Sequence, residues 1–74
     1  MIEDHSRIAL TRAIPERSLV AGDVGTVVAV HDGGKGYTVE FLSLDGTTLA
    51  IETMTADAVR PVRKREIAHV RDVA

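Results

Sequence analysis

Short aliphatic runs, each ended by glycine or another turn residue, divide most of this chain into segments of strand length. The clearest run, residues 24–31, consists mainly of β-branched and small apolar residues, which strands favour. A shorter run covers residues 8–10. The last run, residues 59–62, contains Pro61, which has no N–H to donate, so this strand is expected at a sheet edge. A sheet is therefore predicted rather than a helical fold.

Two further runs show the period of two that a half-buried strand requires. In residues 37–43, every second position is aromatic or aliphatic, and the predicted inward face carries Tyr37, Val39 and Phe41. In residues 47–54, Leu49 and Ile51 alternate with smaller or polar residues and are expected to face inward.

Glycines mark the connections between these runs. Asp-Gly pairs at 32–33 and 45–46 are strong hairpin signals. A longer connection over residues 13–23 ends near a glycine that suits a tight turn, and a glycine within the second run indicates a bulge or a close backbone contact. The predicted structural glycines are Gly22, Gly25, Gly33 and Gly46.

Residues 55–58 are too few for an α-helix and suit one 3₁₀ turn before the closing strand. The predicted fold is all-β: a small five-stranded SH3-like barrel over residues 6–62, with a C-terminal extension over residues 63–74. In that tail, Ile67, Val70 and Ala74 would share one side of a helix that is too short to be stable without a surface to dock on.

The most specific stretch of the chain is Gly22-Asp23-Val24-Gly25-Thr26-Val27-Val28, which is followed by the stretches 37–41, 46–50 and 59–62. This pattern, over roughly residues 8–62, resembles a family of short bacterial proteins, the domain of unknown function 4926 family. The same stretch is similar to the KOW motif and to the barrel of nitrile hydratase β-subunits. These resemblances imply one fold and an uncharacterised, non-catalytic module, which we expect to be the partner or neutraliser of a neighbouring gene's product.

Composition excludes several classes of function. The net charge of −2 gives no long-range attraction to nucleic acid or anionic membranes, and no apolar run has the length of a spanning helix. The chain has no Cys and no basic, apolar leader at its start, so a cytoplasmic location is expected.

Candidate catalytic and metal-binding residues are scattered. His5, His31 and His69 show no metal-ligand spacing, and the serines have no accompanying His and carboxylate signature. The glycines after Asp32 join two strands instead of opening a helix, which argues against a phosphate loop. We expect no enzyme activity, no metal, no cofactor and no small-molecule substrate.

Apolar residues in expected loops and hairpin ends are the candidate protein interface, because exposed apolar clusters mark interaction sites. We expect a protein partner, or self-association as a dimer, because these positions are apolar and the sheet has free edges. For Leu19, the alternative is that its side chain closes one end of the barrel. The candidates are Leu19, Val20, Leu42 and Leu44.

Basic residues near the C-terminal end support an alternative function, a KOW-like module associated with RNA or the ribosome. Such a cluster also forms a merely solvated tail in many proteins. A further alternative is an accessory barrel of a larger enzyme complex. The candidate basic patch consists of Arg60, Arg63, Lys64, Arg65 and Arg71.

Overall fold

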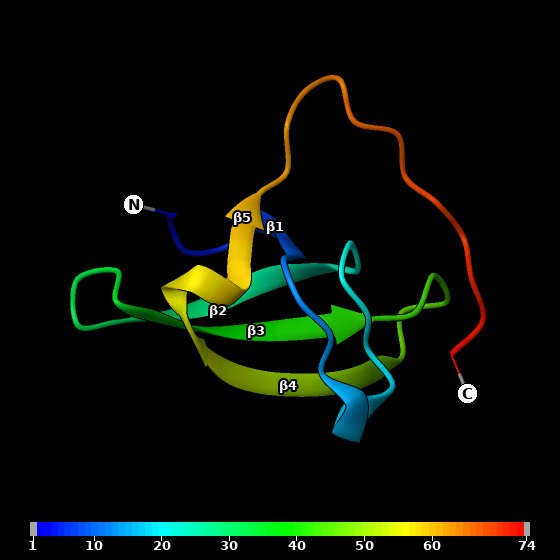
Figure 1. The fold of residues 1–74 in the computed structure, drawn as a ribbon, viewed down its shortest axis with the longest axis horizontal. Coiled ribbons are helices and arrows are strands. Elements are labelled where there is room, and N and C mark those ends of the chain that lie inside the picture. Colours follow the sequence, from blue (N-terminus) through cyan, green and yellow to red (C-terminus); the bar gives the residue numbers. More distant parts are fainter. Residues whose placement is uncertain (1, 74) are drawn as a thin grey trace.

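The computed structural model describes residues 2–73 and shows one antiparallel sheet with the strand order β4-β3-β2-β1-β5 (Figure 1). The strands are β1 (Arg7–Leu10), β2 (Val24–His31), β3 (Gly36–Leu42), β4 (Thr48–Thr55) and β5 (Val59–Pro61). Two 3₁₀ turns, η1 (Pro15–Arg17) and η2 (Ala56–Ala58), lie in the connections. The prediction of a small all-β, SH3-like fold with a 3₁₀ turn before the last strand is confirmed.

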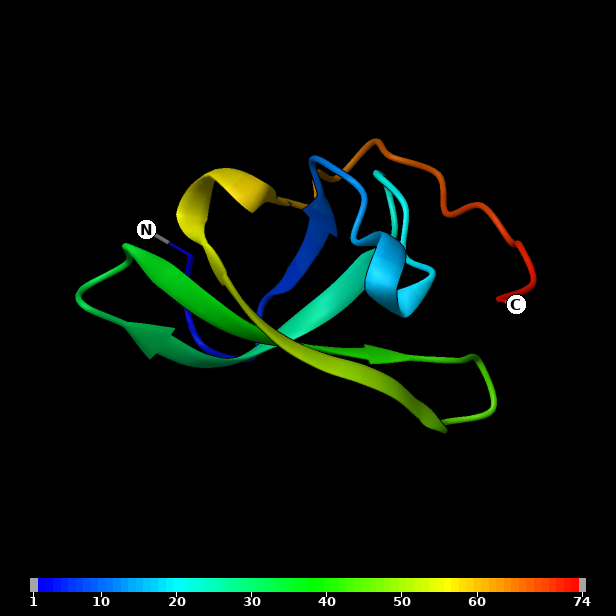
Figure 2. The same cartoon turned by 60° about the horizontal axis from the view of Figure 1, so that its bottom comes forward.

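The sheet is strongly bent, so that β1 and β5 lie over one face of the β2-β3-β4 layer (Figure 2). Between Val27 and Ala29 the register with β3 shifts, which places a bulge in the middle of the long strand β2. Such a bulge increases the local twist of a strand. β4 and β5 are the two edges of the sheet, because neither is paired with the other.

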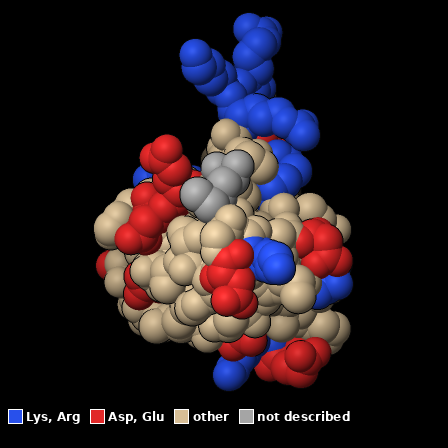
Figure 3. Space-filling view, turned by 90° about the vertical axis from the view of Figure 1, so that its left-hand side faces the viewer, with Lys and Arg blue, Asp and Glu red and all other residues tan. Residues whose placement is uncertain are grey.

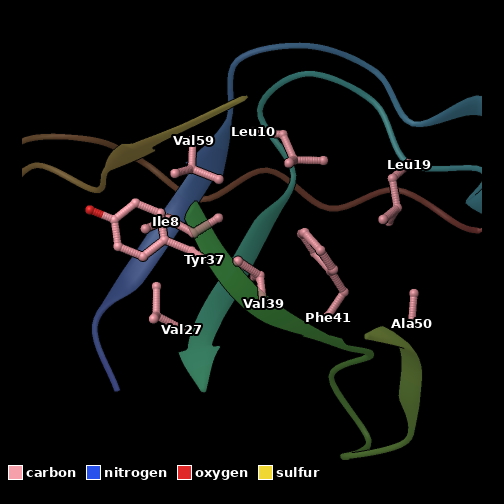
Figure 4. Close-up of a cluster of buried hydrophobic side chains, with 9 residues drawn as sticks. All are labelled: Ile8, Leu10, Leu19, Val27, Tyr37, Val39, Phe41, Ala50 and Val59. Atoms are coloured by element: carbon pink, nitrogen blue, oxygen red, sulfur yellow. The ribbon is translucent and has the colours of Figure 1, made fainter. Parts of the chain in front are cut away.

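The core lies between the two layers and is built from aliphatic side chains around two aromatic rings (Figure 4). Tyr37, Val39 and Phe41 all point inward and are at most 3% exposed, as the alternation in this strand predicts. The Tyr37 hydroxyl accepts a hydrogen bond of 3.2 Å from the backbone N–H of Ile2. The core comprises Ile8, Leu10, Leu19, Val27, Tyr37, Val39, Phe41, Ala50 and Val59.

Strand β4 faces the opposite way from the prediction. Ala50 is the buried residue, whereas Leu49 and Ile51 are 41% and 56% exposed. The register explains this, because Ala50 is the direct partner of Phe41, whose ring fills the interior at this position (Figure 4). Overfilling a packed core costs free energy, so a small side chain fits here and the larger ones lie outside.

The predicted structural glycines have two different roles. Gly22, Gly33 and Gly46 have positive φ angles of 93°, 68° and 88°, so they make turns that other residues adopt at a cost. Gly25 lies inside β2 instead, where an added Cβ would be 2.5 Å from Val39 Cγ1. The expected close contact is thus present at Gly25, and the bulge lies a few residues further on.

After β5 the chain turns back over the body and ends on the opposite side from the β2-β3 hairpin (Figure 1). Residues 62–73 contain no helical turn, so the helical spacing of Ile67 and Val70 does not produce a helix here, and Ala74 lies outside the described residues. Across the described part of the chain, no helix has the length and apolar character needed to cross a bilayer.

Candidate functional site

The face of β2, β3 and β4 that points away from the core combines exposed aliphatic side chains with threonines and one glutamate. Thr26 pairs with Glu40, which pairs with Ile51, and directly paired residues share one face of a sheet. Alternation along each strand places further residues on this side, and it is offset by one residue at the two register shifts, so that Ala29, which pairs with Thr38, and Thr48, which pairs with Leu42, also lie there. We call this side the outer face; its exposed apolar residues are Val24, Val28, Leu42, Leu49 and Ile51.

The polar side chains on this face bond to one another. Thr48 Oγ1 donates to Glu40 Oε2 over 2.8 Å, so the one carboxylate in the centre of the face has a partner. At one end, the Thr38 hydroxyl lies 2.7 Å from His31 Nε2 and 2.8 Å from Thr53 Oγ1. The outer face therefore carries exposed aliphatic side chains around a central, hydrogen-bonded Glu40, and clustered exposed apolar side chains mark protein-binding sites.

The structure brings together part of the predicted interface. Leu42 lies on the outer face, and Leu44, which is 94% exposed, follows directly in the β3-β4 hairpin. Val20 is 44% exposed but belongs to the connection before β2. The prediction that Leu19 is exposed is wrong, because it is 3% exposed and packs in the core.

The burial of Leu19 has a local cause. Its backbone pairs with that of Ile14 across η1, with two hydrogen bonds of 2.9 and 3.1 Å between the two residues. This small loop folds the Leu19 side chain inward, where it lies over the end of the core that contains Phe41 (Figure 4). The alternative interpretation of Leu19, closure of the barrel end, agrees with this position.

Four residues of the outer face were not among the predicted interface residues: Val24, Val28, Leu49 and Ile51. One signal for the first two is visible in the sequence, since β2 has apolar residues on both of its faces and a strand covered on one side alternates instead. For Leu49 and Ile51, the sequence alternation was assigned to the wrong face of the strand.

The predicted basic patch is divided by ion pairs. Arg60 donates from Nη1 and Nη2 to the Glu66 carboxylate over 2.8 and 2.6 Å. The Arg60 hydrogen bonds, together with one from the backbone N–H of Arg63, lower the pKa of Glu66 from its usual 4.5 to about 2. Arg60 is therefore engaged within the chain and is not free to bind a phosphate.

Arg71 is engaged in the same way at the far end of the tail. Its guanidinium binds the Asp23 carboxylate, with Nε 2.9 Å from Oδ1, and Nη2 donates to the carbonyl of Ser18 over 3.0 Å. Burial raises the pKa of Asp23, but the hydrogen bonds from Arg71 and from the Val20 backbone outweigh it and leave the pKa lowered. This contact anchors the tail to the connection before β2.

The remaining basic residues, Arg63, Lys64 and Arg65, are exposed. Figure 3 shows Lys and Arg side chains gathered on a projection at the top, while acidic groups are scattered over the body. The projection corresponds to the orange segment that follows β5 in Figure 1. The cationic surface is therefore smaller than predicted and is separated from the sheet.

A shallow groove runs beside β4, between this strand and the start of the long connection. Its volume is about 370 Å³. Beside the groove, Arg17 Nε of the connection donates to Glu52 Oε2 of β4 over 2.8 Å. The groove holds no metal site of the usual kind, since no group of three potential metal ligands occurs within residues 2–73. The groove is lined by Arg12, Ala13, Ile14, Pro15, Glu16, Glu52, Thr53, Met54 and Thr55.

Comparison with known families supports the resemblance seen in the sequence. A family model described as a domain of unknown function (DUF4926) matches residues 4–61, from three residues before β1 to the end of β5. The chain belongs to this family. Neither a search of curated proteins nor a search of solved structures finds a match. The tail that carries the basic projection lies outside the matched residues.

Proposed function

We propose that this chain is a non-enzymatic module that binds a protein partner, such as the product of a neighbouring gene, through its outer face. The observation that carries the proposal is the set of exposed aliphatic side chains on the side of the sheet opposite the core. Exposed aliphatic side chains that gather on one face mark interaction sites, whereas ones scattered singly do not.

The partner surface that fits this face is largely apolar and offers a hydrogen-bond donor or a cation opposite Glu40. Glu40 is the one carboxylate at the centre of the face, and its Oε2 accepts a hydrogen bond from Thr48. This single bond leaves the carboxylate charged, and burying an unpaired charge is costly. The module's net charge of −2 adds little long-range attraction, so specificity rests on packing and on the group opposite Glu40.

The rival function, RNA binding, has less support from the contacts. Two of the five predicted basic residues, Arg60 and Arg71, donate to carboxylates of the same chain. Both aromatic side chains are in the core, so they cannot act as stacking platforms for bases.

A crosslinking experiment tests the proposal. A photoreactive amino acid at position 42 is expected to capture a protein in an extract of the source cell, because Leu42 lies on the outer face and is 47% exposed. The same amino acid at Lys64, on the basic projection, serves as the matched control. The readout is the mass and identity of crosslinked species.

A second variant confirms that capture depends on the apolar face. Val24→Lys, made in the chain with the probe at position 42, places a charge on β2 of the outer face and is expected to abolish capture. Equal capture from positions 42 and 64, or capture that survives Val24→Lys, would contradict the proposal.

A further inference from the structure

The free edge of β4 is the other unusual surface of the molecule. The backbone N–H of Ala56 donates to the carbonyl of Lys35 over 3.0 Å, which fixes the alternation of hydrogen bonds along β3 and β4. In this alternation, Met54 and Glu52 bond to β3, whereas Ile51 and Thr53 direct their N–H and C=O groups to the opposite side.

Nothing in the described chain pairs with that side, because β3 is the only strand hydrogen-bonded to β4. The edge carries little of the usual protection: its eight residues include no Pro and no Lys, and the one register shift with β3 lies at its N-terminal end, where Leu42 pairs with Thr48. Its single charged residue, Glu52, forms a partly exposed ion pair with Arg17 of the same chain. Such an edge is a template for strand addition.

The charges on β4 restrict how a second copy would pair. An antiparallel register with Glu52 opposite Glu52 of the second copy places like charges together, which is unfavourable. Centring the pairing on Ile51 avoids this, because Glu52 then lies opposite Ala50 of the second copy. This register also overlaps nearly the whole of β4, whereas centring on Thr53 pairs only its C-terminal half.

The area of the outer face argues for a second copy as well. Three strands of seven to eight residues give a flat sheet footprint of roughly 350 Å². Pairing of two β4 strands about a two-fold axis turns both outer faces to the same side. The joined footprint is then roughly 700 Å², and a larger face can bury more surface against a partner.

We propose that β4 pairs antiparallel with β4 of a second copy of this chain, with Ile51 opposite Ile51, and that the dimer presents the two outer faces as one continuous binding surface. The inference rests on the proposed function in that the joined face is the one expected to bind the partner. The net charge of −2 on each copy opposes association only weakly, because salt screens it.

Sedimentation equilibrium of the full chain from about 1 µM to about 500 µM tests the dimer. Thr53→Pro removes an N–H that points to the open edge and leaves the bonds to β3 in place. We expect it to weaken dimerisation at least ~10-fold, since the two-fold axis makes the loss count twice. Thr53→Val loses the same hydroxyl but keeps the N–H, and its dimerisation is expected to stay within about twofold of wild type.

A second pair of variants covers the case in which Thr53→Pro fails to fold, which circular dichroism will reveal. Ile51→Lys places two cations opposite each other at the centre of the seam and is expected to abolish the dimer. Val70→Lys makes the same change of charge on the exposed tail and is expected to leave it intact. A wild-type chain that is monomeric throughout, or a dimer insensitive to both β4 variants, overturns the inference.

The two proposals fail separately. If the chain is monomeric but the probe at position 42 still captures a partner, the β4 dimer is wrong and the proposed function stands. If a dimer forms that is sensitive to Thr53→Pro, and the probe captures nothing except the second copy, the dimer is supported and a separate partner is contradicted.

Discussion

The two edges of the sheet differ in almost every property that governs strand addition. β4 has eight residues, and its free side is open; β5 has three, and its free side carries Pro61. Hydrogen bonds from Val62 N to Arg7 O and from Thr11 N to Ala58 O show that Pro61 lies at a position pointing away from β1. The missing N–H of Pro61 therefore costs no bond inside the sheet.

The side chains of the two edges differ as well. Val59 of β5 is 6% exposed and belongs to the core, whereas Ile51 of β4 is 56% exposed. Beyond β5, the tail folds back and Glu66 pairs with Arg60 of the strand. Both edges contribute to the core and both carry an ion pair, but β5 is short and lacks a donor at Pro61, whereas β4 is long and keeps all of its donors. The contrast indicates that this small fold does not leave edge strands open in general, because only β4 has an open edge among the described strands.

The largest expected effect comes from truncating one side chain on each edge. Val59→Ala is expected to lower the free energy of unfolding by about 2 kcal/mol, because it removes buried methyl groups and leaves a cavity. Ile51→Ala is expected to change it by less than about 0.5 kcal/mol. Urea unfolding followed by circular dichroism measures both, and equal losses would show that the two edges do not differ in packing.

A smaller effect concerns the ion pair beside β5. Because the pKa of Glu66 is lowered from 4.5 to about 2, the pair contributes above about pH 4.5 and is lost as the pH falls through about 2. Carboxyl ¹³C shifts in an NMR titration are expected to give a midpoint near 2 for Glu66, and a higher midpoint in the Arg60→Gln variant that stays below 4.5, because Arg63 still lowers the pKa. An ordinary midpoint in the wild type would mean that the tail does not fold back on this edge.

The smallest effect is expected from restoring a donor to β5. Pro61→Thr is predicted to lower the free energy of unfolding by about 0.5 kcal/mol, since the unfolded chain gains freedom. Association is expected to stay unchanged, because the strand is still short and the tail still flanks it. Sedimentation of this variant beside Thr53→Pro measures both edges in one assay; larger oligomers from Pro61→Thr would show that proline alone keeps β5 from pairing.

Much of the fold was predictable because its signals are local. Asp32-Gly33 and Asp45-Gly46 mark both hairpins, and the alternation of Tyr37, Val39 and Phe41 selects the inward face of β3 correctly. For β4 the same rule selected the wrong face. Which of two alternating sets fits inside depends on the volume left by the paired strand, and here Phe41 leaves room for Ala50 alone. That information is not local.

The candidate site was predicted in part for the same reason. Leu42 and Leu44 were identified from their place at a hairpin end, but Leu19 was misassigned because a loop residue with an apolar side chain either points out or folds in. The ion pairs of Arg60 and Arg71 join residues six and 48 positions apart, respectively. No local sequence pattern can indicate the Arg71–Asp23 pair. The Arg60–Glu66 pair depends on a turn whose geometry the residue types do not specify.

The close approach at Gly25 has a consequence for how the sequence of such a domain can drift. A methyl group at this position would lie 2.5 Å from Val39 and 2.9 Å from the Phe41 ring, so no single larger residue fits while both neighbours keep their size. A relative with alanine or valine at position 25 is therefore expected to carry smaller or displaced side chains at both 39 and 41. Substitutions at positions 25, 39 and 41 are therefore coupled and are expected to occur together.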